Sequence, residues 1–256
     1  VTRMSALVDQ IAELHKTGVE VILVSSGAVA SGRSEVPSAK KLDSVDQRQL
    51  FSAVGQAKLI NRYYELFREH GIPVGQVLTM KENFATRRHY LNQKNCMTVM
   101  LENGVIPIVN ENDTVATHEI EIGDNDTLSA IVASMIGADL LILLSDIDGL
   151  YTDDPRANPD AEFIETVEHL DESFLRMGKS TTGSGVGTGG MSTKLTAATI
   201  ATASGADMVI ANSKDVRIIH RIIDGENYGT LFLAEKQDAF DLPDFVENLH
   251  SCRERG

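Results

Sequence analysis

The stretch TLSAIVASMIGADLLILL, residues 127–144, decides the fold that the sequence predicts. Its first ten residues have the length and composition of a helix, Gly137 is a typical helix terminator, and residues 140–144 are all apolar. A strand without a single polar residue is typical of a parallel sheet that is covered on both faces. We therefore predict a helix at about 127–136 that leads into a buried strand.

The same order of helix, glycine and apolar strand recurs along the chain. Helices are expected at about 4–14, 50–67, 90–103 and 192–204, and strands at 19–24, 72–78, 105–109 and 208–211. In the second of these helices the apolar stripe is Leu50, Val54, Ala57, Ile60, Tyr64 and Phe67. The alternation predicts an α/β fold, a three-layer αβα sandwich with a mainly parallel central sheet. Ligands of such folds bind in loops at the carboxyl ends of the strands.

Length and composition favour one large domain in a soluble, cytoplasmic protein. The chain has 256 residues, of which 42% are hydrophobic and 23% charged, and no linker divides it sharply. We expect one domain over 1–234, followed by an acidic tail at 235–256 that forms no domain of its own. The formal net charge of -14 argues against binding to nucleic acid or to an anionic membrane. No apolar run approaches the roughly 20 residues that span a bilayer.

Metal-binding and disulfide patterns are not recognisable in the sequence. Cys96 and Cys252 are far apart and match neither a zinc spacing nor a disulfide framework. The seven histidines show no spacing typical of metal ligands either. The sequence therefore predicts no protein-held metal centre.

Polar residues follow two of the predicted strands directly. Ser25, Ser26 and Gly27 come after the first strand, where backbone N–H groups and a hydroxyl can bind a carboxylate or phosphate, although a simple helix cap is equally compatible. Residues 110–113, Asn-Glu-Asn-Asp, follow the third strand. They fit a substrate clamp at a strand end, or equally a turn in which Asn and Asp bond their own backbone.

Two further polar groups flank the stretch that decides the fold. Asp124, Asn125 and Asp126 precede its helix, and two carboxylates this close repel each other unless a lysine, a metal ion or backbone donors stabilise them. One of them is explained by an N-cap, but both together favour a functional role. Ser145 and Asp146 end its strand, which is a suitable place for nucleotide contacts.

A glycine-rich segment, GSGVGTGGMSTK at 183–194, runs directly into a helix start. Glycine lets backbone donors approach phosphate oxygens closely. Lys194 lies in the first helical turn, where the helix dipole disfavours a cation unless an anion is bound nearby. The segment lacks the Walker A pattern, and its G-x-G-x-x-G spacing follows no predicted strand, so that spacing alone is a weak signal. The alternative is a flexible surface loop followed by a solvated lysine.

Taken together, these motifs resemble the glutamate 5-kinase branch of the amino-acid kinase family. The resemblance rests on VSSGA (24–28), AVGQ (53–56), VNEND (109–113), GDND (123–126) and GTGGMSTK (187–194), in matching order and spacing. It covers the chain from its first residues to about 232. It implies ATP-dependent phosphorylation of the side-chain carboxylate of L-glutamate to L-glutamyl 5-phosphate, the first step of proline biosynthesis.

The resemblance also implies roles for individual residues. Glutamate is expected to bind to Ser26, Asp113 and Asn125. ATP is expected to bind to Ser145, Asp146, Thr188, Gly189, Gly190, Met191, Ser192, Thr193 and Lys194. Lys194 would stabilise the transferring phosphoryl group, and Asp124 and Asp126 would organise active-site lysines and the amino end of glutamate. The family further implies Mg²⁺, a homo-oligomer and feedback inhibition by proline.

One departure from the family pattern leaves two alternatives open. The family begins with a strand that carries Lys-x-Gly-Ser/Thr, whereas this sequence starts inside the helix that would follow it. One alternative is a non-catalytic binding fragment, which retains affinity for ligand or nucleotide without turnover. The other alternative is a kinase for a different acidic acceptor such as aspartate, because one scaffold serves several substrates.

Overall fold

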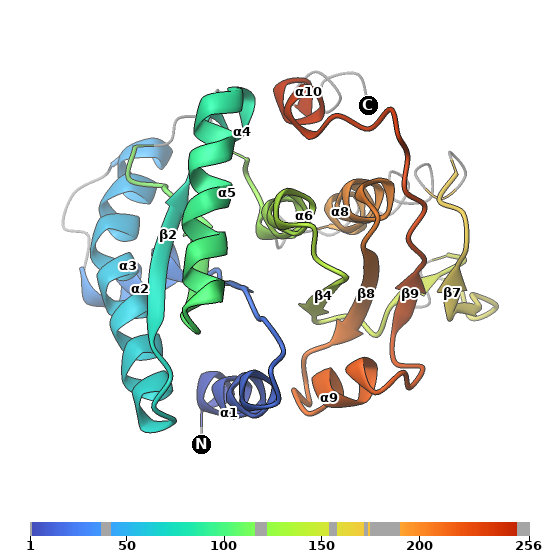
Figure 1. Ribbon diagram of the computed structural model, residues 1–256, viewed down its shortest axis with the longest axis horizontal. Helices are drawn as coiled ribbons and strands as arrows, with labels where there is room; N and C mark the ends of the chain where they lie inside the picture. The colour runs from blue at the N-terminus through green and yellow to red at the C-terminus, as the bar shows by residue number, and fades with distance from the viewer. Residues whose placement is uncertain are drawn as a thin grey trace. The chain divides into compact units, whose positions relative to one another are not determined.

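The computed structural model describes residues 2–36, 42–115, 122–153, 158–171, 174 and 190–249. The chain divides into two compact units, Val1–Asn125 and Asp126–Gly256, each with a sheet of its own (Figure 1). In the described residues, no helix has both the length and the apolar character that a membrane span requires.

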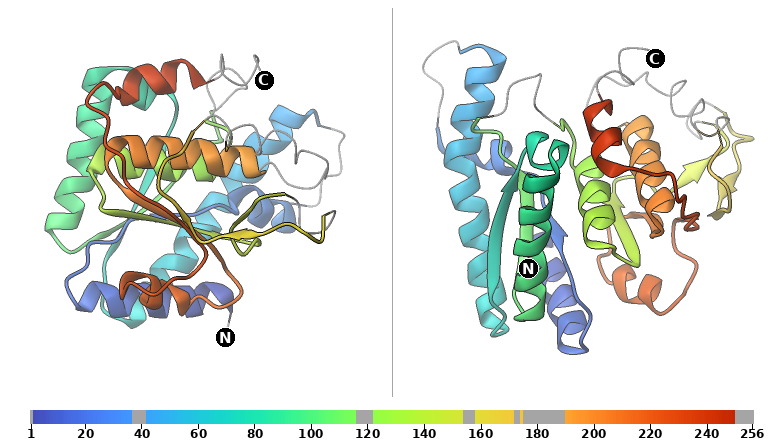
Figure 2. Two further views of the ribbon diagram at one scale, coloured as in Figure 1. Left: turned by 90° about the vertical axis from the view of Figure 1, so that its right-hand side faces the viewer. Right: turned by 45° about the horizontal axis from the view of Figure 1, so that its top comes forward.

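The first unit is a parallel sheet between helices. Its elements are α1 (Arg3–Lys16), β1 (Leu23–Val24), α2 (Ala28–Glu35), α3 (Ser44–Glu69), β2 (Val74–Thr79), α4 (Glu82–Ala85), α5 (Arg87–Glu102) and β3 (Ile106–Glu111). The strand order is β1-β3-β2, and both pairs are parallel. The right-hand view of Figure 2 shows β2 between α3 and α5. Apolar side chains of α1 and α3 form one core with Ile106 and Ile108 of β3.

Several helices of this unit begin at a side-chain cap. The side chains of Thr2, Asp43 and Thr86 accept hydrogen bonds from backbone N–H groups in the first turns of α1, α3 and α5. Such caps satisfy N–H donors that have no partner within the helix. They explain why these helices start ahead of the apolar stripes from which they were predicted.

Strand β1 is shorter than the predicted strand at 19–24. Its parallel ladder pairs Leu23 with Ile108 and Val24 with Val109. The same register would bring Val21 opposite Ile106, where β3 begins, so residues before Val21 have no partner strand there. Apolar composition therefore overestimated the length of the strand.

The predicted buried stripe of α3 is wrong in phase. Leu50 and Tyr64 are exposed, and of the predicted set only Phe67 is buried. The side that is buried carries Phe51, Ser52, Gly55, Gln56, Leu59, Tyr63, Leu66 and Phe67. The cause is close contact with α2, because a Cβ added to Gly55 would lie 1.7 Å from the carbonyl oxygen of Ala28. Small residues, and not apolar ones, therefore mark the contact face in this part of α3.

The second unit has the same layered construction. Its elements are α6 (Asn125–Ile136, beginning at the last residue of the first unit), β4 (Leu140–Ser145), β5 (Leu150–Tyr151), β6 (Phe163–Ile164), β7 (Thr166–Val167), α8 (Met191–Ser204), β8 (Asp207–Asn212), α9 (Ile218–Ile223), β9 (Thr230–Phe232) and α10 (Leu242–Glu247). The sheet order is β4-β8-β9-β7, parallel except between β8 and β9, while β5 and β6 form a separate antiparallel pair. Figure 2 shows α6 and α8 on one face of the sheet and α9 on the other. The predicted α/β sandwich with mainly parallel strands is confirmed.

Strand β4 is less buried than its apolar sequence predicts. Leu143 is buried, but the other residues of β4 are partly exposed. Within the described residues β4 pairs only with β8, which makes it an edge strand of this sheet. Its apolar residues Leu140, Ile142 and Leu144 pack against the cluster formed by α9 and β8.

Helix α8 is buried over most of its surface. Leu195, Ile200 and all four of its alanines lie in the core. Its hydroxyl groups at Thr199, Thr202 and Ser204 donate to carbonyl oxygens four residues earlier in the same helix. Hydroxyls bonded in this way need no partner from the surrounding core.

The predicted tail packs into the second unit as far as the structure describes it. The backbone N–H groups of Glu235 and Gln237 donate to carbonyl oxygens at the end of α8. Farther on, α10 buries Leu242 and Val246, and Leu249 is buried just after it. These contacts anchor residues 235–249 despite their acidic composition.

Candidate active site

In the first unit, polar residues lie at the carboxyl ends of the neighbouring parallel strands β1 and β3, as the sequence predicted. Ser25 is buried, and its hydroxyl lies 2.8 Å from that of Tyr63 on α3. Burial raises the pKa of Tyr63, and the hydrogen bond to Ser25 opposes that rise. Ser26 is exposed, and the N-cap residue of α2 is Gly27, which provides no side-chain cap. A serine cap therefore does not explain this motif.

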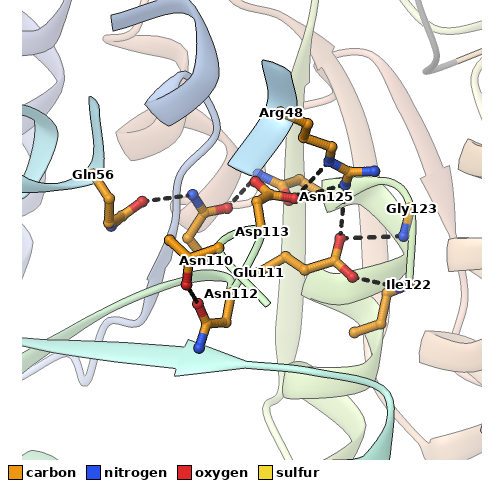
Figure 3. A network of polar contacts seen from close by, with 10 residues as sticks. Arg48, Gln56, Asn110, Glu111, Asn112, Asp113, Ile122, Gly123 and Asn125 are labelled. Atoms are coloured by element: carbon orange, nitrogen blue, oxygen red, sulfur yellow. Dashed lines mark hydrogen bonds and ion pairs between the residues drawn. The ribbon is translucent and has the colours of Figure 1, made fainter. Parts of the chain in front are cut away.

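An arginine of α3 bridges two carboxylates at the end of β3. Figure 3 shows the guanidinium of Arg48 against Asp113 and Glu111. Its Nε donates to Oδ1 of Asp113 at 2.8 Å, and its Nη2 lies 2.6 Å from the same oxygen and 3.5 Å from Oε2 of Glu111. The Arg48 side chain is 30% exposed, but the carboxylates are only 5% (Glu111) and 10% (Asp113) exposed. The bridge offsets repulsion between two nearly buried negative charges.

Glu111 also anchors the segment that leads into α6. Its carboxylate accepts hydrogen bonds from the backbone N–H groups of Ile122 and Gly123. Burial raises the pKa of Glu111, and the charge of Asp113 adds to the rise, while the two N–H groups and Arg48 oppose it. The carboxylate is thus held beside residues 124–126, the acidic motif that the sequence singled out.

A chain of amide groups fixes a second part of the same site. Nδ2 of Asn110 donates to Oε1 of Gln56 on α3 at 3.0 Å, and Nδ2 of Asn125 donates to Oδ1 of Asn110 at 3.4 Å (Figure 3). Asn110 and Gln56 are buried. The alternative of a self-bonded turn therefore does not describe Asn110 or Glu111, which both belong to β3.

Arg48 and Gln56 were not predicted as site residues. Both lie on the buried side of α3, eight residues apart, with Ser52 between them. The sequence signal was present, because an arginine in line with a buried face requires a carboxylate partner. It was missed because the stripe beginning at Leu50 was assigned to the wrong side of the helix.

In the second unit, a lysine and a carboxylate form a partly buried ion pair. Nζ of Lys194 lies 2.9 Å from Oδ2 of Asp126, and the hydroxyl of Thr193 donates to the same oxygen at 3.1 Å. The Lys194 side chain is 8% exposed and that of Asp126 is 23% exposed. The structure thus brings together three residues that are 67 and 68 positions apart in sequence. The alternative of a solvated lysine therefore does not describe Lys194.

The first turn of α8 is suited to binding an anion. The N-cap residue is Gly190, which has no side chain that could cap the backbone N–H groups at this end of the helix. Met191, Ser192, Thr193 and Lys194 form the first turn. Thr188 and Gly189 lie outside the described residues. Asp126 offsets the unfavourable position of the Lys194 cation at this helix end.

The carboxyl ends of β4 and β8 form a third polar group. Ser145 is paired with Asn212 in the parallel ladder, and its hydroxyl donates to Oδ1 of Asp146 at 3.2 Å. Nδ2 of Asn212 donates to Asp148 at 2.7 Å and to the carbonyl oxygen of Asp146 at 3.4 Å. Asn212 was not predicted, although it follows an apolar strand in the same way as the predicted residues.

The described residues contain no group of three or more His, Cys, Asp or Glu side chains that could hold a metal ion. Asp124, directly before α6, is partly buried. Mg²⁺ in kinases is bound through one or two carboxylates together with substrate phosphates, so it does not require such a group. The arrangement is compatible with an ion that arrives on a nucleotide.

Comparison with known proteins gives the class that this fold and these sites define. The family model described as "Amino acid kinase family" matches residues 1–212, and the chain belongs to that family. Curated relatives are more specific. The chain is 65% identical to a glutamate 5-kinase of Bacteroides thetaiotaomicron over 86% of this chain and 60% of the relative. It is 46% identical to a glutamate 5-kinase of Clostridium acetobutylicum over 92% of this chain and 88% of the relative.

Solved structures with the same fold are more distant in sequence. An isopentenyl phosphate kinase of T. acidophilum, in a product complex, has a TM-score of 0.54 at 16% identity and covers 91% of this chain and 92% of its own. A UMP kinase of Bacillus anthracis has a TM-score of 0.58 at 16% identity, covering 91% and 86%. The chain spans about 60% of the length of the Bacteroides relative.

Proposed function

We propose that the protein is a kinase that transfers the γ-phosphoryl group of ATP to the side-chain carboxylate of L-glutamate. The observation that carries the proposal is the position of Lys194. This residue lies in the first turn of α8, its side chain is nearly buried, and its ammonium group is 2.9 Å from the carboxylate of Asp126. A cation in that position is suited to a phosphoryl group in transfer. The names of the similar proteins support glutamate as the acceptor.

The proposed reaction is a direct in-line transfer. A side-chain carboxylate oxygen of glutamate attacks the γ-phosphorus, an O–P bond forms, and the bond to the bridging oxygen of ADP breaks. ADP leaves with the electron pair. The nucleophile is already ionised, so no general base is needed, and catalysis consists of positioning and charge neutralisation.

The proposal assigns the acceptor to the first unit and the nucleotide to the second. Ser26, Asp113 and Asn125 would bind glutamate, with oxygen acceptors that suit its ammonium group. Asp124 and Asp126 would orient the active-site lysine and the amino end of glutamate.

The nucleotide would bind as its magnesium complex, with Lys194 neutralising charge on the transferring group. Its phosphates would lie against the segment of Thr188, Gly189, Gly190, Met191, Ser192 and Thr193, and Ser145 and Asp146 would contact the rest of the nucleotide. The uncapped start of α8 supports this assignment.

The test is ADP release from Mg-ATP with glutamate, with aspartate and without an acceptor. Release that depends on glutamate and exceeds release with aspartate is expected. A preference for aspartate would replace the substrate assignment. Equilibrium binding of glutamate and ATP without glutamate-dependent release would instead support a binding protein.

Three further properties belong to the same proposal. A biosynthetic kinase that uses ATP and glutamate is expected to act in the cytoplasm. It is also expected to form a homo-oligomer and to be inhibited by proline. Sedimentation of the purified protein and inhibition curves with proline test these two expectations separately.

A further inference from the structure

One side of α3 is polar, although it is buried. Arg48, Ser52 and Gln56 follow each other at intervals of four residues, which places them along one face of the helix. Ser52 is 2% exposed and Gln56 is 7% exposed. Buried polar side chains normally have hydrogen-bond partners. Here Arg48 bonds to Asp113 and Glu111, and Gln56 bonds to Asn110, all at the end of β3.

Arg48 controls the charge of the carboxylate pair. Its guanidinium contacts Asp113 at 2.6 Å and Glu111 at 3.5 Å. Without that charge, two nearly buried carboxylates would face each other, and one would take up a proton or move away. Glu111 would then release its hold on the N–H groups of Ile122 and Gly123, directly before Asp124 and Asn125.

Gln56 controls the orientation of an amide. Because Oε1 of Gln56 accepts from Nδ2 of Asn110, Oδ1 of Asn110 points to Asn125. Nδ2 of Asn125 donates to that oxygen, so the oxygen of the Asn125 amide is the atom that can accept a hydrogen bond from a ligand. If the Asn110 amide turned over, Asn125 would have to turn with it.

We propose that Arg48 and Gln56 are positioning residues for the acceptor substrate. Arg48 keeps Asp113 ionised and in place, and Gln56 keeps the amide oxygen of Asn125 turned toward the substrate. Both residues act through others and contact no reacting atom. This inference rests on the proposed function, because Asp113 and Asn125 are the acceptor-binding residues of that proposal.

The test compares Arg48→Met, Arg48→Lys and Gln56→Met in the intact protein. Arg62→Met is the matched control, because Arg62 lies on the same helix and pairs with Glu65 at 3.5 Å with both side chains about half exposed. Glutamate KM, ATP KM and kcat are measured between about pH 5 and pH 8. The groups that face Glu111 and determine its titration are Arg48 and Asp113, besides the two backbone N–H groups.

Arg48→Met should raise the glutamate KM at least about tenfold and change the ATP KM by less than about twofold. It should also move the acidic limb of the kcat/KM profile to higher pH, because the carboxylates lose a neighbouring positive charge. Arg48→Lys keeps the charge and should leave that limb in place. Gln56→Met should raise the glutamate KM without moving the limb, since the lost group is neutral. The control should behave as the unsubstituted protein.

Amide hydrogen exchange of residues 122–126 gives a readout that is independent of activity. Faster exchange in Arg48→Met than in the control is expected, and unchanged exchange would overturn the anchoring role of the arginine. Equal changes in both KM values, or a loss of thermal stability alone, would overturn the positioning role. If the unsubstituted protein releases no ADP with glutamate, the proposed function fails, and the acceptor role of both residues fails with it.

Discussion

Replacing Lys194 with methionine removes the ammonium group but keeps the length of the side chain. Removing one preorganised charge from a transition state lowers turnover by a factor of about 10²–10³, or ~2.7–4 kcal/mol. The variant also leaves Asp126 without this cation, and breaking a fully buried ion pair costs about 3–5 kcal/mol. Because the Asp126 side chain is 23% exposed, water offsets part of that cost, and we expect a stability loss of about 1–2 kcal/mol.

A second substitution separates the two effects. Asp126→Asn removes the unpaired carboxylate, so the double variant should recover most of the stability lost in Lys194→Met. It should not recover turnover, since the cation is still missing. ADP release with saturating Mg-ATP and glutamate measures turnover, and thermal unfolding of the same samples measures stability.

Two results would refute this reasoning. Turnover of folded Lys194→Met within about tenfold of the unsubstituted protein would show that the cation does not stabilise the transferring group. Recovery of turnover in the double variant would show that Lys194 serves only to neutralise Asp126.

Two predictions concern stability. Gly55→Ala should lower the unfolding free energy by about 3 kcal/mol and Tm by roughly 6–12 °C, because the new Cβ would lie 1.7 Å from the backbone oxygen of Ala28 and 2.4 Å from the backbone nitrogen of Gly32. Gly190→Ala, with nothing within 4 Å of its new Cβ, should change Tm little, and equal effects in the two variants would contradict the packing argument. For Glu111 the folded-state pKa is raised above the ordinary 4.5, so its contribution to stability is fully present below that value and lost as the pH rises through the folded-state pKa. Glu111→Gln should make this decline shallower in unfolding measurements at several pH values, and an unchanged slope would show that another group causes it.

The sequence predicted the order of helices and strands well where one physical signal dominates. Gly137 and Gly205 adopt positive φ angles of 73° and 99° at helix ends, as the helix–glycine–strand pattern requires. The lengths of the strands were less predictable, because a strand extends only as far as a neighbouring strand can pair with it. Residues 19 and 20 of the predicted strand lie beyond the end of the register with β3, which no local property of residues 19–24 reveals.

The loops of the candidate site were singled out from the sequence, but its supporting helix was not. Asp113, Asn125, Asp126 and Lys194 were recognised from motifs at strand ends and helix starts. Their partners on α3 depend on which side of a long helix faces inward, and apolar periodicity gave the wrong side. Close backbone contact at Gly55 buries small and polar residues, so hydrophobicity carries little information there.

Helix α8 should tolerate changes in its length poorly, because its small side chains are buried and its hydroxyls donate to its own carbonyl oxygens. Inserting one residue within an α-helix turns everything beyond it by about 100°. In α8 such a turn would exchange the buried alanines for positions such as Thr196 and Thr199 and displace β8 from its register with β4. Among related chains, insertions and deletions should therefore be rare between Gly190 and Gly205 and more frequent in the connections on either side.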